Sequence, residues 1–90
     1  MASSFLKDPD AVLDYMFDWS SWLQSGETIS TSTMTASTGI TVDSDVATTT
    51  TTTVWLSGGT AGETYEVTNH ITTSNSRAED RTITIVCLER

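Results

Sequence analysis

Alternation of apolar and polar side chains at every second position is the feature that most restricts how this chain can fold. In the stretch 65–73, Tyr65, Val67 and Ile71 share one face of an extended chain, and polar side chains occupy the other. A period of two is typical of an antiparallel strand that is buried on one side. Asn69 interrupts the apolar face. The stretch is therefore predicted to be a half-buried strand with one polar residue in its buried row.

The alternation returns near the end of the sequence. Ile83, Ile85 and Cys87 share one face of the stretch 81–88, and the stretch 74–80 before it is polar and rich in turn-forming residues. Two alternating segments joined by such a connection predict a hairpin.

Six consecutive threonines, Thr48–Thr53, resemble a low-complexity linker, but Pro, Gly and Ser are absent from the run. Threonine is β-branched and favours strands. The run leads directly into Val54, Trp55 and Leu56, which end at Ser-Gly-Gly. The second half of the run is predicted to be strand, and Thr48–Thr50 a loop.

Two further strands are expected upstream of the threonine run. The stretch 27–36 is rich in Thr and Ser and contains Ile29, and Ile40 with Val42 forms a short strand that ends at 43–45. The glycine-rich stretch 57–62 has no following Lys and no helix start, so a hairpin connection is expected there rather than a phosphate site.

The stretch 8–23 allows two interpretations. Asp8 before Pro9 is a helix N-cap signal, and Val12, Trp19 and Leu23 would line one helix face. Aromatic residues at every second position up to Trp19 favour a strand instead. We expect a strand and keep the helix as the alternative.

Short strands separated by turn signals, with no convincing helix after them, predict one all-β domain, a single immunoglobulin-like antiparallel β-sandwich. Tyr65, two residues before Val67 and just after a turn, matches the position of a tyrosine corner. Val67 stands where an antibody domain has cysteine. We expect residues 1–10 to be an extended N-terminal segment and residues 11–90 to be the sandwich domain.

Composition excludes several classes of function. Ninety residues fit one small domain, and no apolar run or signal sequence predicts membrane insertion or export. A formal net charge of −8 would repel nucleic acid, so no nucleic acid or membrane partner is expected. The single cysteine, Cys87, cannot form an internal disulfide, which fits assembly in a reducing cytoplasm.

The sequence contains no convincing catalytic, cofactor or metal site. His70 is the only histidine, so a solvated side chain is the expected role, and Cys87 is expected to be a buried small hydrophobe. The acidic residues do not follow the spacing of a calcium loop, so we expect them to be solvated. These residues are Asp8, Asp10, Asp14, Asp18, Asp43 and Asp45. We expect no enzyme and no cofactor.

Partner contacts are expected at Trp22 and at the N-terminus. Core packing is the first expectation for Trp19 and Trp55, whereas Trp22 is out of alternation with Trp19, so either the chain bends there or one ring stays exposed. Phe5 and Leu6 are the large apolar residues of an otherwise polar terminus. We expect residues 1–7 to extend from the domain and pack Phe5 and Leu6 on a neighbouring protein, with Phe5 closing its own core as the alternative.

Three segments carry a resemblance to a known family, and together they cover nearly the whole chain. They are LKDPDAVLDYMFDWSSWLQSGETI, TVWLSGGTAGETYEVTNHITTSNSRAEDRTITI and the closing LER, with DWSSWL and VWLSGGTAGETYEVTN as the more specific parts. The chain resembles a family of small proteins encoded in tailed-phage structural gene clusters, with fibre–tail adaptor or neighbouring head–tail roles. The threonine run is longer than the usual tract before VWLSGG.

The resemblance implies an immunoglobulin-like virion protein without enzymatic activity. The expected partners are other phage structural proteins of the tail, neck, fibre or capsid, which the chain would meet in several symmetric copies per particle. An adaptor joining tail and fibre or neck proteins is the leading hypothesis. A capsid decoration protein is the first alternative, and a carbohydrate-binding module with an exposed aromatic ring is the second.

Overall fold

The computed structural model describes residues 3–8 and 11–88, and these contain seven strands and no helix. The strands are β1 Ser3–Lys7, β2 Leu13–Asp18, β3 Ile29–Ala36, β4 Ile40–Ala47, β5 Thr51–Gly58, β6 Thr64–Thr73 and β7 Ala78–Cys87. The expected all-β fold is confirmed.

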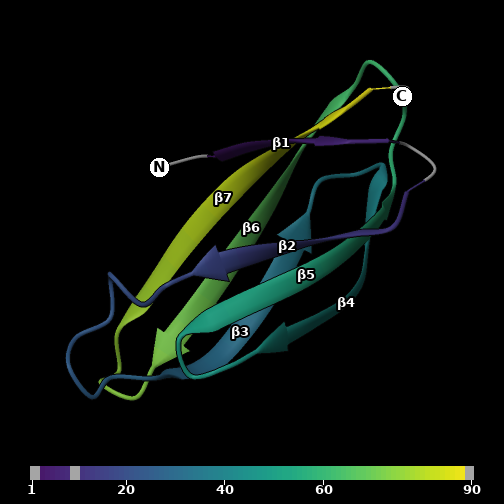
Figure 1. The fold of residues 1–90 in the computed structure, drawn as a ribbon. Coiled ribbons are helices and arrows are strands. Elements are labelled where there is room, and N and C mark those ends of the chain that lie inside the picture. The colour runs from purple at the N-terminus through teal and green to yellow at the C-terminus, as the bar shows by residue number, and fades with distance from the viewer. Residues whose placement is uncertain (1–2, 9–10, 89–90) are drawn as a thin grey trace.

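Two sheets pack face to face as a sandwich (Figure 1). One has the strand order β1-β7-β6-β3 and the other β2-β5-β4. When the strands are lettered in chain order, B, E and D lie in one sheet and C, F and G in the other, which is compatible with an immunoglobulin-like arrangement. All pairs are antiparallel except β1 and β7, which run parallel. The expectation of a purely antiparallel sandwich is corrected at this pair.

The stretch 8–23, for which the sequence allowed a helix or a strand, contains the strand β2, Leu13–Asp18. In β2, Tyr15 and Phe17 are buried while Asp14 and Met16 are exposed, which is the alternation of a strand buried on one side. After β2 the chain turns, because the backbone N–H groups of Trp22 and Leu23 both donate to the carbonyl of Trp19. The helix alternative is therefore wrong, and the bend expected between Trp19 and Trp22 is present.

The threonine run divides as expected. Thr48 turns the chain between β4 and β5, since its hydroxyl accepts hydrogen bonds from the N–H groups of Thr50 and Thr51 at 3.3 and 3.0 Å. β5 begins at Thr51, and the buried side chains of Thr52, Val54 and Leu56 follow at every second position. Trp55 therefore faces outward and is only half-buried, so the expectation of a core position for Trp55 is corrected.

Two strand boundaries differ from the expectation. β4 continues through Asp43 to Ala47, because a bulge between Val42 and Ser44 lets pairing with β5 resume. β7 begins at Ala78, and the polar residues Glu79 and Asp80 belong to the strand because they pair with β6. Polarity suggested a turn at both places, but exposed strand positions also accept polar residues.

The N-terminal residues up to Lys7 belong to the sandwich where they are described. Ser3–Lys7 pairs with residues 83–87 of β7. The buried Lys7 ammonium donates to the carbonyls of Gly58 at 2.7 Å and Asp8 at 3.0 Å, which fastens the end of β1 to the end of β5. The expected extension is corrected for Ser3–Lys7, and residues 1–2 and 9–10 of it lie outside the described residues.

The core fills the space between the two sheets. Its buried apolar residues are Tyr15, Phe17, Trp19, Ile40, Val54, Leu56, Tyr65, Val67, Ile71, Ile83, Ile85 and Cys87. The Tyr65 hydroxyl accepts a hydrogen bond of 2.9 Å from the N–H of Thr60, the backbone link that a tyrosine corner makes. A Cβ at Gly39 would lie 2.7 Å from the Tyr65 ring, so this turn requires glycine. The core positions expected for Tyr65, Val67, Ile71, Ile83, Ile85 and Cys87 are confirmed.

A buried polar network crosses the sandwich at Asn69. The Asn69 side-chain oxygen accepts hydrogen bonds from the Trp19 indole N–H at 3.0 Å and from the Thr52 hydroxyl. Its amide nitrogen donates to the Ser32 hydroxyl at 2.9 Å and the Thr33 carbonyl at 3.2 Å. This one side chain therefore joins both sheets, which explains why a polar residue stands in the apolar row of β6.

An ion pair between the buried Glu27 and the partly exposed Arg77 joins the loop after β2 to the β6–β7 turn. The Glu27 carboxylate, whose side chain is buried, accepts hydrogen bonds from Arg77, from the Thr73 hydroxyl and from the N–H of Gln24. The hydrogen bond from Arg77 is the main cause that lowers the pKa of Glu27 from 4.5 to about 2. The guanidinium of Arg77 also lies 4.1 Å from the centre of the Trp22 ring.

We predict that Asn69→Leu destabilises the domain. The change removes the closer acceptor of the Trp19 indole, which keeps only the Thr52 hydroxyl at 3.4 Å, and it removes the acceptor of the buried Thr52 hydroxyl. A buried polar group left without a partner costs about 1–3 kcal/mol. Guanidinium unfolding followed by Trp fluorescence measures the free energy of unfolding. Asn75→Leu, in the exposed turn, is the control and should change it by less than about 0.5 kcal/mol. Equal stability of the two variants would contradict the role given to Asn69.

We predict that the melting temperature falls as the pH drops from 4.5 to about 2, partly because of Glu27. In this window the unfolded chain takes up a proton at Glu27 while the folded chain does not, so protonation favours unfolding. Glu27→Gln should lower the melting temperature at neutral pH and flatten its dependence on pH in this window. Glu66→Gln, at an exposed strand position, should keep the wild-type slope. A Glu27→Gln variant with that same slope would be evidence against the ion pair.

Candidate partner-binding site

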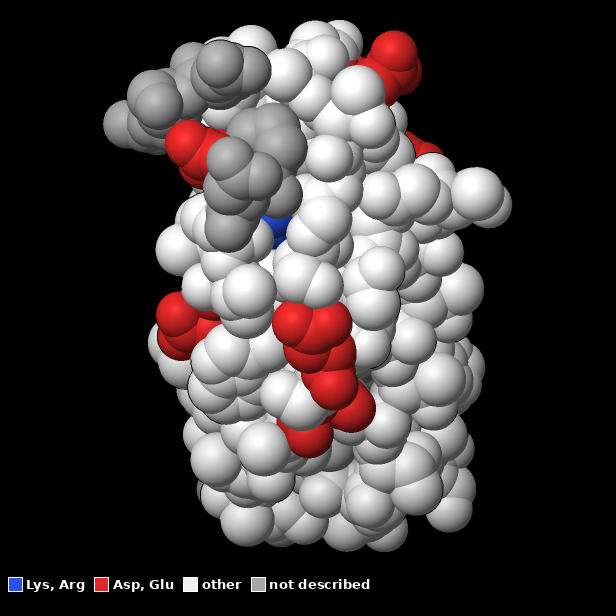
Figure 2. Space-filling model, turned by 90° about the vertical axis from the view of Figure 1, so that its right-hand side faces the viewer, with Lys and Arg blue, Asp and Glu red and all other residues white. Residues whose placement is uncertain are grey.

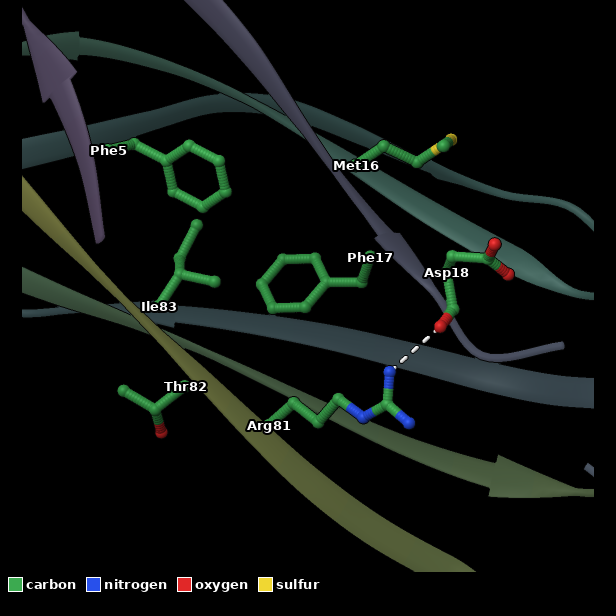
Figure 3. A pocket seen from close by; sticks show the side chains of 7 residues that line it. All are labelled: Phe5, Met16, Phe17, Asp18, Arg81, Thr82 and Ile83. Atoms are coloured by element: carbon green, nitrogen blue, oxygen red, sulfur yellow. Dashed lines mark hydrogen bonds between the residues drawn. The ribbon is translucent and has the colours of Figure 1, made fainter. Parts of the chain in front are cut away.

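A groove of about 370 Å³ opens between the two sheets where β1, β2 and β7 meet. It is lined by Phe5, Met16, Phe17, Asp18, Arg81, Thr82 and Ile83, from these three strands (Figure 3). The volume lies within the range of about 300–1,000 Å³ that ligand pockets occupy. It is therefore large enough to hold apolar side chains of a partner.

The floor of the groove is apolar. The side chains of Phe5, Phe17 and Ile83 point toward one another, whereas the side chain of Met16 points away from them (Figure 3). The Phe5 ring is tilted against the ring of Tyr15, with 5.1 Å between their centres. The Tyr15 hydroxyl donates to the Leu6 carbonyl at 3.3 Å, which ties β2 to β1 beside the groove. Strand pairing and this contact hold the floor in place.

A guanidinium group stands at one end of the groove. Arg81 donates from Nη1 to the Asp18 carbonyl at 2.8 Å, and its guanidinium carbon lies 4.3 Å from the centre of the Trp19 ring (Figure 3). The Asp18 carboxylate is exposed, and hydrogen bonds from Ser20 lower its pKa, with a smaller contribution from the charge of Arg81. The groove therefore has an apolar floor and a charged rim.

The three residues expected to contact partners lie in different places. Phe5 lines the groove, is 36% exposed, and packs its ring against that of Tyr15. Leu6 is exposed and pairs with Val86. Trp22 is half-buried, with one face under Arg77 and its ring 5.5 Å from that of Trp19. The structure brings neither Leu6 nor Trp22 into the groove.

The groove includes residues that the sequence did not single out as partner contacts. Met16 and Phe17 come from β2, and Arg81 and Ile83 come from β7, more than sixty positions later. No spacing or motif connects these two segments, so only the packing of the two sheets could bring them together. The alternation placed Phe17 and Ile83 on buried faces. Alternation identifies residues of the core, but it does not show where a groove opens at the edge of the core.

Each basic side chain among the described residues forms hydrogen bonds within the domain. Lys7, Arg77 and Arg81 all donate to acceptors inside the domain, whereas Asp14, Asp43 and several other carboxylates are exposed. On the face that Figure 2 shows, red acidic groups gather near the centre and blue is confined to one small area. The described surface is therefore acidic.

The structure places the remaining candidates for chemistry as follows. Cys87 is buried, as expected, and His70 is exposed and paired with Asp80. Among the described residues, no group of three or more His, Cys, Asp or Glu side chains could hold a metal ion. The same part of the chain has no helix long and apolar enough to cross a membrane.

Comparison with known proteins agrees with the resemblance noted in the sequence. A model of the family described as "Podophage GP4 fiber-tail adaptor protein gp77" matches residues 7–86, which include six of the seven strands almost completely. No curated protein matches the chain. Because the family model covers most of the sequence, the chain belongs to the podophage GP4 fibre–tail adaptor protein gp77 family and is a phage structural protein.

Proposed function

We propose that this protein is an adaptor that joins a tail protein to a fibre or neck protein in a podophage virion. The family match over residues 7–86 carries the proposal. In the same proposal the protein is not an enzyme, assembles in the host cytoplasm and is present in several symmetric copies per particle. Its partners are other phage structural proteins and neither nucleic acid nor membrane.

The physical properties of the domain suit such a role. Buried hydrogen bonds at Asn69 and the ion pair at Glu27 hold the sheets together from within. The edges and the groove are therefore available to neighbouring chains without changes in the core. Most of the charged groups on the surface are acidic, so the domain would also favour neighbours with basic surfaces.

We predict that the protein is a stoichiometric component of purified particles, and quantitative mass spectrometry can count its copies. An adaptor at a symmetric junction should be present on the order of tens of copies, in a multiple of three or six, whereas a capsid decoration protein should be present in hundreds. Particles of a phage whose genome lacks this gene should have no fibres but should keep filled heads. Absence of the protein from wild-type particles would refute the adaptor role, and hundreds of copies would favour decoration.

We further propose that the exposed apolar side chains of β1 contact a neighbouring protein, with Leu6 as the main contact and Phe5 behind it. Leu6 is 51% exposed, and Val46 on the distant edge strand β4 is 52% exposed, so the two provide a matched pair. Burial of one such side chain stabilises a complex by about 1.5–3 kcal/mol before ordering costs.

We predict that Leu6→Ser lowers the occupancy of the protein in particles at least several-fold, whereas Val46→Ser leaves it unchanged. Repeated weak contacts around a symmetric junction amplify the loss of each one. A phage that lacks the gene is grown on host cells that carry a plasmid with each variant, and mass spectrometry of the purified particles measures occupancy. The melting temperature of each purified variant is the folding control. Equal occupancy of both variants would exclude Leu6 as a contact. Trp22 stays a weaker candidate because Arg77 covers one face of its ring.

A further inference from the structure

β3 is an edge strand that carries no charged residue. It ends the sheet order β1-β7-β6-β3, and its sequence is ISTSTMTA (Figure 1). The other three described edge strands each contain at least one charged residue, and β4 is also bulged in its middle. Charges and bulges protect a sheet edge from pairing with another chain. β3 has no charge, and its pairing with β6 is regular from Thr31 to Ala36, so this stretch is the least protected edge of the described sheets.

The edge of β3 is distant from the described residues that adjoin the undescribed ones. Those adjoining residues lie in β1, next to β1 or before β2, and Leu88 is held at β1 by its hydrogen bond to the Lys7 carbonyl. β1 and β3 are three strand spacings apart, which is about 14 Å, whereas two residues reach at most about 7 Å. β2 lies at the opposite edge of its sheet from β4. The availability of the β3 edge therefore follows from described residues alone.

The hydrogen-bond pattern shows which backbone groups of β3 face the open edge. The N–H of Ser37 donates to the carbonyl of Glu66 at 2.9 Å, in line with the register of β3 and β6. Bonded pairs recur at every second residue of an antiparallel ladder, so the odd-numbered residues of this part of β3 bond to β6. The backbone groups of Ser32, Met34 and Ala36 therefore point away from β6, where no other described strand pairs with β3.

The chain itself uses this edge at the two ends of the open stretch. The N–H of Ile29 donates to the carbonyl of Thr49, in the loop after β4, at 2.9 Å. The N–H of Ile40, at the start of β4, donates to the carbonyl of Ser37 at 3.5 Å. β4 therefore runs beside β3 in the opposite direction, in the other sheet, and the open stretch lies between these two contacts.

The inner side of the open edge has an apolar part and a charged part. Met34, Ala36 and Val42 are partly buried apolar residues that pack against the core. Asp45 is the register partner of Val54, whose side chain is buried, so Asp45 lies on the same inner face of its sheet. Asp45 is nevertheless exposed, because β4 is an edge strand. A strand added at the edge of β3 would therefore meet apolar groups and a carboxylate on its inner side.

We propose that an extended segment of a tail or fibre protein adds to the edge of β3 as a further strand. The proposal rests on the adaptor role and names the kind of partner. Backbone groups of the segment bond to Ser32, Met34 and Ala36, and these bonds provide the affinity. The inward side chains of the segment provide the specificity. An apolar one packs on Met34 and Ala36, and a Lys or Arg two positions away reaches Asp45.

Charge distinguishes this partner from a second copy of the chain. The described basic side chains of Lys7, Arg77 and Arg81 donate within their own domain, so none of them serves as a partner for Asp45 of another copy. Two chains of net charge −8 also repel each other. The occupant is therefore a basic extended segment. Because β1 with Leu6 and β3 are opposite edges of one sheet, the domain has two separate contacts, as an adaptor requires.

Met34→Pro and Met34→Ala form a matched pair that tests strand addition. Both variants lose the methionine side chain, but only proline removes the N–H that faces the open edge, a position where a strand tolerates proline. The probes are synthetic peptides of about ten residues that tile the tail and fibre proteins of the same phage. We expect binding by peptides with an apolar residue two positions from Lys or Arg. Met34→Pro should bind them at least about tenfold more weakly than Met34→Ala, and equal affinity would overturn the proposal.

Asp45→Asn tests the charged contact without a change in the backbone. It should weaken the binding of basic peptides about two- to fivefold at low salt. Asp14→Asn, on the opposite edge strand β2, should leave binding unchanged. Both aspartates are exposed, so neither change should alter folding. Equal binding of basic peptides and of their copies with Glu in place of Lys and Arg would overturn the assigned chemistry of the partner.

Hydrogen exchange of the wild-type protein provides a readout that does not depend on the proline variant folding. The amides of Ser32, Met34 and Ala36 should exchange fast in the free protein and slowly when a peptide is bound, whereas those of Thr33 and Thr35 should exchange slowly in both states. Sedimentation of the free protein shows whether it is a monomer. Protection of the first three amides in a free monomer, or in a dimer of the chain, would mean that the edge is already filled and would overturn the proposal.

The adaptor role and the edge proposal can fail separately. If the protein is present in particles, and Met34→Pro particles keep as many fibres as Met34→Ala particles, the edge of β3 is not the contact although the adaptor role stands. If the protein is absent from particles, the adaptor role fails, and this proposal, which rests on that role, fails with it.

Discussion

The side chain of Asn69 is the interaction on which the arrangement of the two sheets depends. Its oxygen accepts hydrogen bonds from Trp19 and Thr52 on the side of β2 and β5, and its nitrogen donates to Ser32 and Thr33 of β3. Apolar contacts are not directional, so they allow sheets to slide. A buried amide whose donors and acceptors are all used fixes one relative position, because any other leaves polar groups without partners.

The same network fixes the register of the threonine run. A strand of identical residues can shift by one position at little cost, and such a shift would turn each side chain to the opposite face. Thr52 alone of the run is fully buried, and its hydroxyl bonds to Asn69. Downstream, Val54 and Leu56 enter the core on the same face. One hydrogen-bonded threonine and two apolar residues therefore select a single register for a segment whose sequence alone is ambiguous.

How far the sequence could predict the structure depended on which interactions determine each element. The alternation of β6 and β7 reports burial on one face, so these strands and their core residues could be predicted. The parallel pairing of β1 could not, because it joins Ser3–Lys7 to residues 83–87 at the other end of the sequence. The inward choice of Val54 and Leu56 over Trp55 was also undetermined, since three consecutive apolar residues do not say which face is buried. The groove could not be predicted from the sequence, because its lining residues from β2 and β7 come together only when the two sheets pack.

The placement of charge connects the inside of this small domain with its outside. The described basic side chains, Lys7, Arg77 and Arg81, donate to carbonyls and to Glu27 and so hold strand ends and loops together. Because these groups bond within the domain, carboxylates dominate the exposed charge of the described residues, and like charges repel. Two of these carboxylates, Glu79 and Asp80, are exposed on β7. A strand that carries adjacent carboxylates resists pairing with the same strand of a second copy, because like charges would then face each other.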